Sequence, residues 1–293
     1  MSRAAAGAAL FLASVATGFA DPAFEHDRAQ WSNARLKATK LFKSMHVEIG
    51  ISEPDNATVE AELITHDHRK LLAPSFPVIG LSYTTDGLGR HSDIDLLVEP
   101  ATGQVLQRIS HETGKRNKYR VYRFARNGTL RRTRRPNPGE EPAGPDGWSD
   151  RSEQYFKSPV EVRGQPLTEP GTLIYLISTS DLERPSDRFE MTAFSTSDET
   201  IYRIEAVVLD PETIDYDYEL ADGTNRLGRT EAIRVAIRGK PLAGGYDGDL
   251  TLLGMKDVEL MLDPATRAPL ELTGKVAVFG RISFDLKRLE PRR

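Results

Sequence analysis

Apolar and polar side chains alternate with a period of two along residues 257–289. Ten apolar side chains of this stretch occupy even positions, whereas Lys275 and Asp285 occupy odd ones. The ten are Val258, Leu260, Leu262, Leu270, Leu272, Val276, Val278, Ile282, Phe284 and Leu286. Because successive side chains of a β-strand point to opposite faces, this pattern predicts strands with one buried and one solvated face. A turn at residues 263–266 and the glycine Gly280 divide the stretch into three strands.

Similar short strands are predicted along most of the preceding chain. Turns rich in Gly, Pro, Asn and Asp separate them at a spacing of about ten residues. The predicted segments are 46–51, 57–65, 76–84, 93–99, 104–111, 118–126, 188–195, 200–209, 215–220, 229–238 and 250–253. Strands at this spacing are typical of a meander, a barrel or a sandwich. Residues 149–156 are expected to form a short helix, and residues 168–178 fit either a helix or a strand.

The N-terminal part of the chain has a different spacing, which is typical of an amphipathic helix. Its apolar side chains recur at intervals of three and four at Trp31, Ala34, Ala38 and Leu41, followed by Phe42. Asp21 and Pro22 suit the start of a helix, because Asp caps free N–H groups and Pro lacks one. We therefore expect an amphipathic helix over residues 21–44 that covers the apolar face of the sheet.

These elements predict a mainly β protein. We expect one strongly curved antiparallel sheet or open barrel, with the N-terminal covering helix and one or two short helices. Residues 135–148 are rich in Pro and Gly and form either a loop or a linker between domains. We favour the loop, which makes residues 45–290 a single β domain. Residues 93–102 resemble residues 257–266, and either two independent hairpins with the same turn chemistry, which we prefer, or an internal duplication explains this similarity.

Residues 1–20 have the layout of a cleavable secretory signal peptide. They carry one charge, Arg3, then a short apolar run, and end with the small residues Gly18 and Ala20 around the apolar Phe19. The chain contains no cysteine, which excludes disulfides and thiol catalysis. Export without cysteine suits a bacterial periplasm, where a core of this size does not need disulfides. We expect a periplasmic or secreted protein with no transmembrane anchor after signal cleavage.

The charges are distributed unevenly along the chain. The formal net charge is -4 at pH 7, which argues against nucleic acid as a partner. Residues 115–135 nevertheless contain ten cations and no acid, while residues 204–225 contain seven acids and no base. The two segments either face each other or solvate an edge hairpin. In the functional interpretation, the cations form a patch for an anionic lipid or glycolipid of the cell envelope.

One predicted strand of this basic segment combines cations with aromatic rings. On residues 118–126, Tyr122 and Phe124 share even parity with Arg120 and Arg126. Such a face suits an amphiphile with an anionic head, because Arg forks two donors onto a phosphate while rings cover apolar surface. The candidate ligand-binding residues are Arg120, Tyr122, Arg123, Phe124, Arg126, Arg131 and Arg132.

Candidates for metal binding and catalysis are few. His66 and His68 form the His-x-His of the chain, which places two rings on one face of a strand. We prefer to interpret them as a polar strand end in water. Residues 215–219 lack the glycine and glutamate of a calcium loop and are better explained as an acidic, exposed strand face. Because no catalytic motif is present, we expect neither an enzyme nor a cofactor or metal site.

Several segments resemble an uncharacterised family of secreted bacterial domains of unknown function. The segments that carry this resemblance are the region of Leu176 and residues 118–135, 187–189, 201–205, 228–238, 263–270 and 279–282. The order of signal peptide, amphipathic helix and β-meander is also similar to the periplasmic lipoprotein-carrier (LolA-like) half-barrel. That resemblance implies a curved sheet that holds acyl chains under a helical lid, although no carrier motif is matched residue by residue.

Together these features predict an exported, non-enzymatic binding or carrier protein of the bacterial envelope. Its ligand would be an amphiphile or lipid-like molecule on the concave face of the sheet. The alternative is a structural or adaptor protein of envelope assembly, with an envelope protein as partner and no small ligand. Fold alone does not decide between the two.

Overall fold

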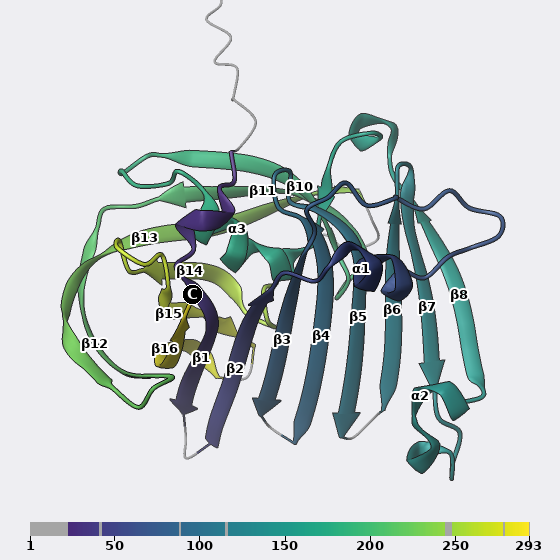
Figure 1. The fold of residues 1–293 in the computed structure, drawn as a ribbon, viewed down its shortest axis with the longest axis horizontal. Coiled ribbons are helices and arrows are strands. Elements are labelled where there is room, and N and C mark those ends of the chain that lie inside the picture. Colours follow the sequence, from purple (N-terminus) through teal and green to yellow (C-terminus); the bar gives the residue numbers. More distant parts are fainter. Residues whose placement is uncertain are drawn as a thin grey trace, which may run out of the picture.

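The computed structural model describes residues 23–40, 43–87, 89–114, 117–243, 248–277 and 279–292. The predicted fold class is confirmed, because the protein is mainly β and most of its chain lies in one curved sheet (Figure 1). In the described residues this sheet has sixteen strands. Their order is β8-β7-β6-β5-β4-β3-β2-β1-β16-β15-β14-β13-β11-β10-β9, with β12 beside β13 and β16.

Most strands follow one another directly along the chain, and a few short helices and helical turns interrupt the series. The strands are β1 (Trp31–Lys40), β2 (Lys43–Ser52), β3 (Ile79–Gly87), β4 (Arg90–Glu99), β5 (Gln104–Gly114), β6 (Lys118–Ala125), β7 (Gly128–Arg135), β8 (Asp150–Lys157), β9 (Leu167–Thr168), β10 (Arg188–Ser195), β11 (Thr200–Val208), β12 (Glu212–Leu220), β13 (Asn225–Ala243), β14 (Lys256–Leu262), β15 (Pro269–Val276) and β16 (Gly280–Pro291). The helices are α1 (Asn56–Glu62), α2 (Gly144–Gly147) and α3 (Leu173–Thr179), with 3-10 turns η1 (His26–Arg28), η2 (Glu141–Ala143), η3 (Val160–Val162) and η4 (Pro170–Thr172).

Strands β12 to β16 form a closed five-stranded barrel. Each strand pairs antiparallel with the next, and the end of β12 runs parallel to the end of β16 at Glu219↔Arg288 and Leu220↔Leu289. The first part of β13 pairs with β12 and its last part pairs with β11. Since β16 also pairs with β1, the barrel continues without a break into the wing of strands β1 to β8 (Figure 1).

The wing curves around the short helix α3, whose seven residues are all buried. The main hydrophobic core joins α3 to side chains from both halves of the sheet, including Trp31 on β1, Leu81 on β3 and Leu260 on β14. Figure 1 shows α3 enclosed between the barrel and the strands of the wing. This helix, rather than an N-terminal one, fills the hollow of the curved sheet.

The buried side chain of Arg267 holds α3 in place. Arg267 follows the β14–β15 turn with a left-handed φ of 58°. Its guanidinium donates hydrogen bonds to backbone carbonyls at and beyond the end of α3, at Ile177 (2.9 Å), Ser178 (3.2 Å), Ser180 (3.0 Å) and Leu182 (2.8 Å). Because the last carbonyls of a helix have no partner within it, these bonds satisfy groups that would otherwise be buried unpaired.

The predicted amphipathic helix over residues 21–44 is wrong, because residues 31–40 form strand β1. The spacing of three between the buried Trp31 and Ala34 arises from a β-bulge just after Trp31, which inserts one residue opposite β16. From Ala34 onward the buried positions Leu36 and Ala38 follow the normal period of two. The β-bulge therefore produced an interval of three residues between buried side chains, which is also the spacing of a helix.

Three further assignments are corrected. Residues 57–65, expected as a strand, mostly form α1, which the Asp55 side chain caps by accepting a hydrogen bond from the Thr58 N–H at 2.8 Å. Residues 149–156, expected as a helix, form β8, which is antiparallel to β7. Residues 250–253 contain one isolated bridge instead of a strand.

The three strands predicted in residues 257–289 are confirmed as β14, β15 and β16. Phe284 is buried as expected, while Lys275 and Asp285 are exposed. Val278, Leu41, Phe42 and the predicted signal peptide at residues 1–20 lie outside the described residues. Strands β7 and β8 pair with each other on either side of the Pro/Gly-rich stretch, which therefore joins neighbours within one sheet.

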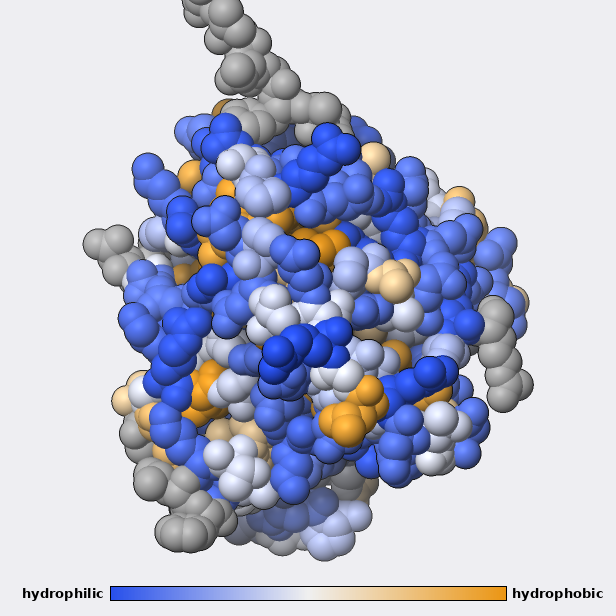
Figure 2. Space-filling view, turned by 90° about the vertical axis from the view of Figure 1, so that its left-hand side faces the viewer, coloured by the Kyte–Doolittle hydropathy of each residue, from blue (hydrophilic) through white to orange (hydrophobic). Residues whose placement is uncertain are grey.

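The outer face of the barrel is mostly polar. Figure 2 shows this side of the molecule as largely hydrophilic, with small and separate hydrophobic spots. Along β12 the acids Asp215 and Asp217 are exposed, whereas Tyr216 and Tyr218 are half-buried and contact the core. This alternation agrees with the interpretation of residues 215–219 as an acidic strand face. In the described ranges no helix combines the length and apolar character needed to cross a membrane.

Candidate functional site

The candidate residues of β6 point to two different faces of the sheet. Tyr122 and Phe124 are completely buried in the main core, and the Tyr122 hydroxyl donates to the Thr196 carbonyl at 3.2 Å. Arg120 lies on the same face and lines a partly open cavity. Arg126 is exposed in the turn after β6.

Arg123 lies on the opposite face, where it is 5% exposed. Its guanidinium donates to the carbonyls of Ile64 and Leu72 at 2.9 Å each, and to that of Leu106. Burial lowers the pKa of Arg123 to about 10, so the side chain still carries its charge at pH 7. These contacts attach the connection between α1 and β3 to the outside of the sheet.

The cations of β7 pair with nearby acids. Arg131 contacts Glu199 and donates to Gln154, while Arg132 donates to Glu153 at 2.9 Å. The remaining salt bridges of residues 115–135 lead to Glu112, Asp146 and Asp150. Within the described ranges, none of the salt bridges of this basic segment reaches residues 204–225, so the two oppositely charged segments do not face each other.

A cavity of about 540 Å³, partly open to solvent, lies between the wing and the barrel. It is bounded by strands β2 to β6 of the wing and by β15 and β16 of the barrel. Three connections complete it: residues 169–171 before α3, the turn 195–197 after β10, and residues 251–255 before β14. Arg120 is the member of the predicted ligand-binding set that lines this cavity.

One wall of the cavity is polar. Arg108 on β5 lies between Leu96 and Tyr122 of the neighbouring strands, and its guanidinium is 5.7 Å from the centre of the Tyr122 ring. The side chain is 10% exposed, and its Nε lies 3.5 Å from Oε1 of Glu169. In the described part of the chain, Nε and Nη1 of Arg108 have no hydrogen-bond partner.

Other donors of the polar wall also lack a partner among the described residues. They are the Tyr83 hydroxyl and Nε of Arg120. Burial, assisted by the negative charge of Glu169, raises the pKa of Tyr83, so its hydroxyl keeps its proton. Arg120 lies 3.3 Å from Glu112. Because buried polar groups are almost always paired, this cluster of free donors requires an explanation.

The Glu169 carboxylate is held by its own segment. Oε2 accepts a hydrogen bond from the Gly171 N–H at 2.6 Å, and Oε1 accepts one from the Thr196 hydroxyl at 2.9 Å. Both contacts pull the carboxylate toward the η4 turn and the β10–β11 turn. The ion pair with Arg108 is therefore long, and Nε and Nη1 of Arg108 make no hydrogen bond within the described residues.

The facing wall of the cavity is apolar. Its side chains come from β2, from the two last strands of the barrel and from the connection before β14. They are Met45, Val47, Met255, Val276, Ile282 and Phe284. A cavity of several hundred Å³ with a mostly apolar lining and a few polar groups is the usual form of a site for a small organic ligand.

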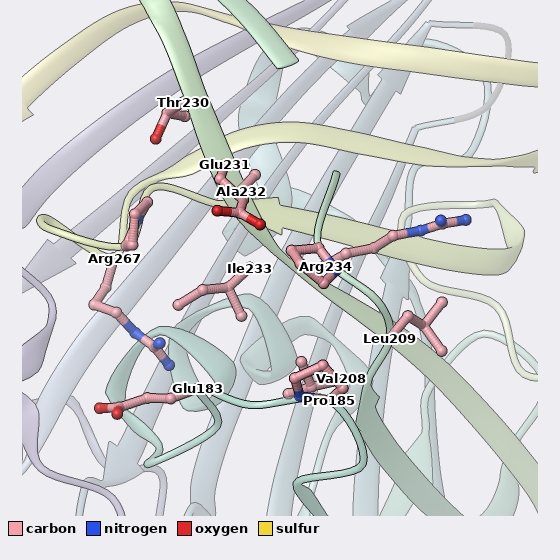
Figure 3. A pocket seen from close by; sticks show the side chains of 12 residues that line it. Glu183, Pro185, Val208, Leu209, Thr230, Glu231, Ala232, Ile233, Arg234 and Arg267 are labelled. Carbon is pink, nitrogen blue, oxygen red and sulfur yellow. The ribbon is translucent and has the colours of Figure 1, made fainter. Parts of the chain in front are cut away.

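A second hollow of about 620 Å³ opens on the surface beside β13 (Figure 3). Figure 3 shows Ile233 near its centre, with Arg234 pointing away from it and Arg267 reaching toward Glu183. Arg267 already donates to backbone carbonyls, and Arg234 pairs with Glu259 at 2.7 Å. Its cations are thus occupied, which makes this hollow a poorer ligand site than the cavity between the wing and the barrel.

The two candidate metal-binding histidines occupy a turn instead of a strand. His66 Nε2 lies 3.0 Å from Oε1 of Glu153, and His66 Nδ1 accepts a hydrogen bond from the His68 N–H at 3.0 Å. Within the described ranges, no group of three or more His, Asp or Glu side chains is placed to hold a metal ion. The His66 ring nitrogens are thus engaged within the protein.

The sequence-based search missed Tyr83, Arg108 and Glu169. It was guided by the density of cations in residues 115–135, which selected side chains from both faces of the sheet. Arg108 did carry a signal, because it is a single cation in the otherwise uncharged segment 104–110. Such a cation in a strand that is buried on both faces needs a partner or a ligand.

The comparisons with known proteins give no assignment: no family model, no curated protein and no solved structure matches the chain. The resemblance to an uncharacterised secreted family and to the lipoprotein-carrier half-barrel therefore stays a prediction.

Proposed function

We propose that this protein is an exported, non-enzymatic binding or carrier protein that holds an amphiphile in the cavity between its wing and its barrel. The proposal combines the secretory pattern of residues 1–20 with the two unlike walls of the cavity. Its ligand would lie against the apolar wall and direct its polar end toward Arg108. A periplasmic or extracellular location follows from the same pattern.

The observation that carries this proposal is the group of free donors beside an apolar surface. Leaving a buried donor without a partner costs about 1–3 kcal/mol, and more for a charged group. The Tyr83 hydroxyl and two nitrogens of Arg108 are in this condition. A ligand with acceptor atoms removes the cost, and its apolar part gains from leaving water at the facing wall.

Mass spectrometry of a solvent extract from the purified protein tests the proposal. The protein should be prepared from its secreted form, without detergent, and extracted after extensive washing. We expect an amphiphile in an amount approaching one molecule per chain. A matched extract from a variant in which Ile94, which lines the cavity, is replaced by Trp should contain much less, because the indole fills the ligand space.

A titration of the protein with defined ligands gives the result that would contradict the proposal. Protein freed of extracted material should bind hexadecanoic acid, hexadecanol or hexadecyltrimethylammonium, as measured by displacement of a fluorescent fatty acid. A clean extract, together with no binding of any of these three probes, would refute the proposal. That result would favour a structural or adaptor protein whose partner is an envelope protein.

A further inference from the structure

The cavity is large enough for one chain of atoms with a small head. Its volume is about 540 Å³. At about 30 Å³ for each water-sized group, this corresponds to roughly 18 non-hydrogen atoms. A single acyl chain of moderate length with a small head fits this space, whereas two long acyl chains would extend beyond it into solvent.

The free groups of the polar wall favour a head with acceptor atoms. The Tyr83 hydroxyl and Nε and Nη1 of Arg108 are buried donors without a hydrogen-bond partner among the described residues, and both residues line the cavity. A carboxylate accepts several hydrogen bonds with its two oxygens and matches the fork of a guanidinium. An ammonium head offers no acceptor, and an alcohol offers one neutral oxygen, so both would satisfy these donors less well.

Glu169 opposes an anion in this place. Its carboxylate is 3.5 Å from Arg108 Nε, and the side chain is 8% exposed, so the charge acts with little screening by water. The Gly171 N–H and the Thr196 hydroxyl hold both of its oxygens. The carboxylate is thus fixed near Arg108 without a hydrogen bond to either Nε or Nη1.

We infer that the ligand is a single-chain amphiphile with a carboxylate head, that Arg108 and Tyr83 bind this head, and that Glu169 limits its affinity by sharing the charge of Arg108. This inference rests on the proposed function, since it specifies the ligand of the same cavity. Glu169 is a positioning residue, because it acts on the ligand through Arg108. Because Glu169 partly neutralises the charge of Arg108, the bound carboxylate can dissociate again, as a carrier requires.

The test compares four probes on the washed full-length protein: hexadecanoic acid, hexadecanol, hexadecyltrimethylammonium and a phosphatidic acid with two palmitoyl chains. We expect hexadecanoic acid to bind about tenfold or more tightly than hexadecanol, which is the value of one charge-assisted hydrogen bond. The phosphatidic acid and the ammonium should bind more weakly than the acid. Equal affinities for the acid and the alcohol would overturn the carboxylate assignment while leaving amphiphile binding intact, and tight binding of the two-chain lipid would overturn the single-chain assignment.

Substitutions then identify the residues. Arg108→Gln should remove the preference for the acid over the alcohol, whereas Glu169→Gln should increase it several-fold, because the uncharged amide no longer competes for Arg108. Tyr83→Phe should fold like the wild type, since the hydroxyl it removes has no hydrogen-bond partner among the described residues. It should weaken the binding of hexadecanoic acid by about threefold to tenfold and leave the binding of hexadecanol unchanged. Arg132→Gln, on the opposite face, is the matched control and should bind like the wild type.

Melting curves of every variant accompany these titrations. An unchanged preference in Tyr83→Phe, or an unchanged or reduced preference in a folded Glu169→Gln variant, would overturn the roles assigned to these residues. Failure of all four probes to bind the wild type would instead refute the proposed function itself.

Discussion

Replacing Arg123 by Gln should destabilise the protein strongly, although Arg123 belongs to the basic segment first proposed for ligand binding. Its buried guanidinium donates to three backbone carbonyls, two of which lie in the connection between α1 and β3. Each hydrogen bond from a charged donor contributes about 1.5–3 kcal/mol. The three contributions are not additive, because Gln keeps one donor group and the loop carbonyls regain water.

We therefore expect Arg123→Gln to lower the free energy of unfolding by about 3 kcal/mol. Arg126→Gln is the matched control: it makes the same change three positions along, at an exposed side chain, and should cost under about 0.5 kcal/mol. Urea unfolding followed by tryptophan fluorescence measures both, because Trp31 and Trp148 are buried. With a slope of about 3 kcal/mol/M, the midpoint of Arg123→Gln should fall by roughly 1 M.

Hydrogen exchange adds a local test of the same substitution. Amides of residues 63–72 should exchange faster in Arg123→Gln than in the wild type, because their segment loses its attachment to the sheet. Equal urea midpoints for the two variants, with no change of exchange in this segment, would refute the structural role of Arg123. The same result combined with weaker ligand binding would restore Arg123 as a ligand-binding residue.

Three further substitutions test the core and the pH dependence. Phe284→Ala should cost about 3 kcal/mol of unfolding free energy and Asp285→Ala under about 0.5 kcal/mol, since only the first side chain is buried; similar urea midpoints would reject this register. Hydrogen bonds with Asp86 and Asp93 raise the pKa of His91, so the folded state binds a proton more tightly than the unfolded state does. This proton stabilises the folded state at low pH, and the stabilisation disappears as the pH rises through the raised pKa. His91→Gln should therefore lower the free energy of unfolding at pH 5 and have little effect on it at pH 9. An NMR titration of His91 that gives an ordinary or lowered pKa would contradict this.

The strand pattern predicted much of this fold because burial of one face imposes a period of two. The three strands of residues 257–289 and the exposure of Lys275 and Asp285 follow from that rule alone. Failures occurred where a local feature changes the spacing. A bulge beside Trp31 produced an interval of three, and the capping side chain of Asp55 started a helix where alternation indicated a strand.

The candidate site was harder to predict, because it depends on which distant segments meet. Arg108 and Glu169 are 61 positions apart in the sequence and approach each other only through the curvature of the sheet. Arg120, which was predicted, lies beside them because β5 and β6 are neighbours. The alternation of side chains along a strand places Arg120 and Arg123 on opposite faces, but it does not show which face is concave.

Photolabelling of the cavity tests the central claim most directly. A sixteen-carbon carboxylic acid with a diazirine near the end of its tail is bound to the full-length protein, activated by light, and mapped by peptide mass spectrometry. The account predicts saturable labelling of the apolar wall at Met45, Met255 or Phe284, competed by unlabelled hexadecanoic acid and reduced in Arg108→Gln. Labelling confined to the surface hollow around Ile233 or to the outside of the sheet near α1 would contradict it.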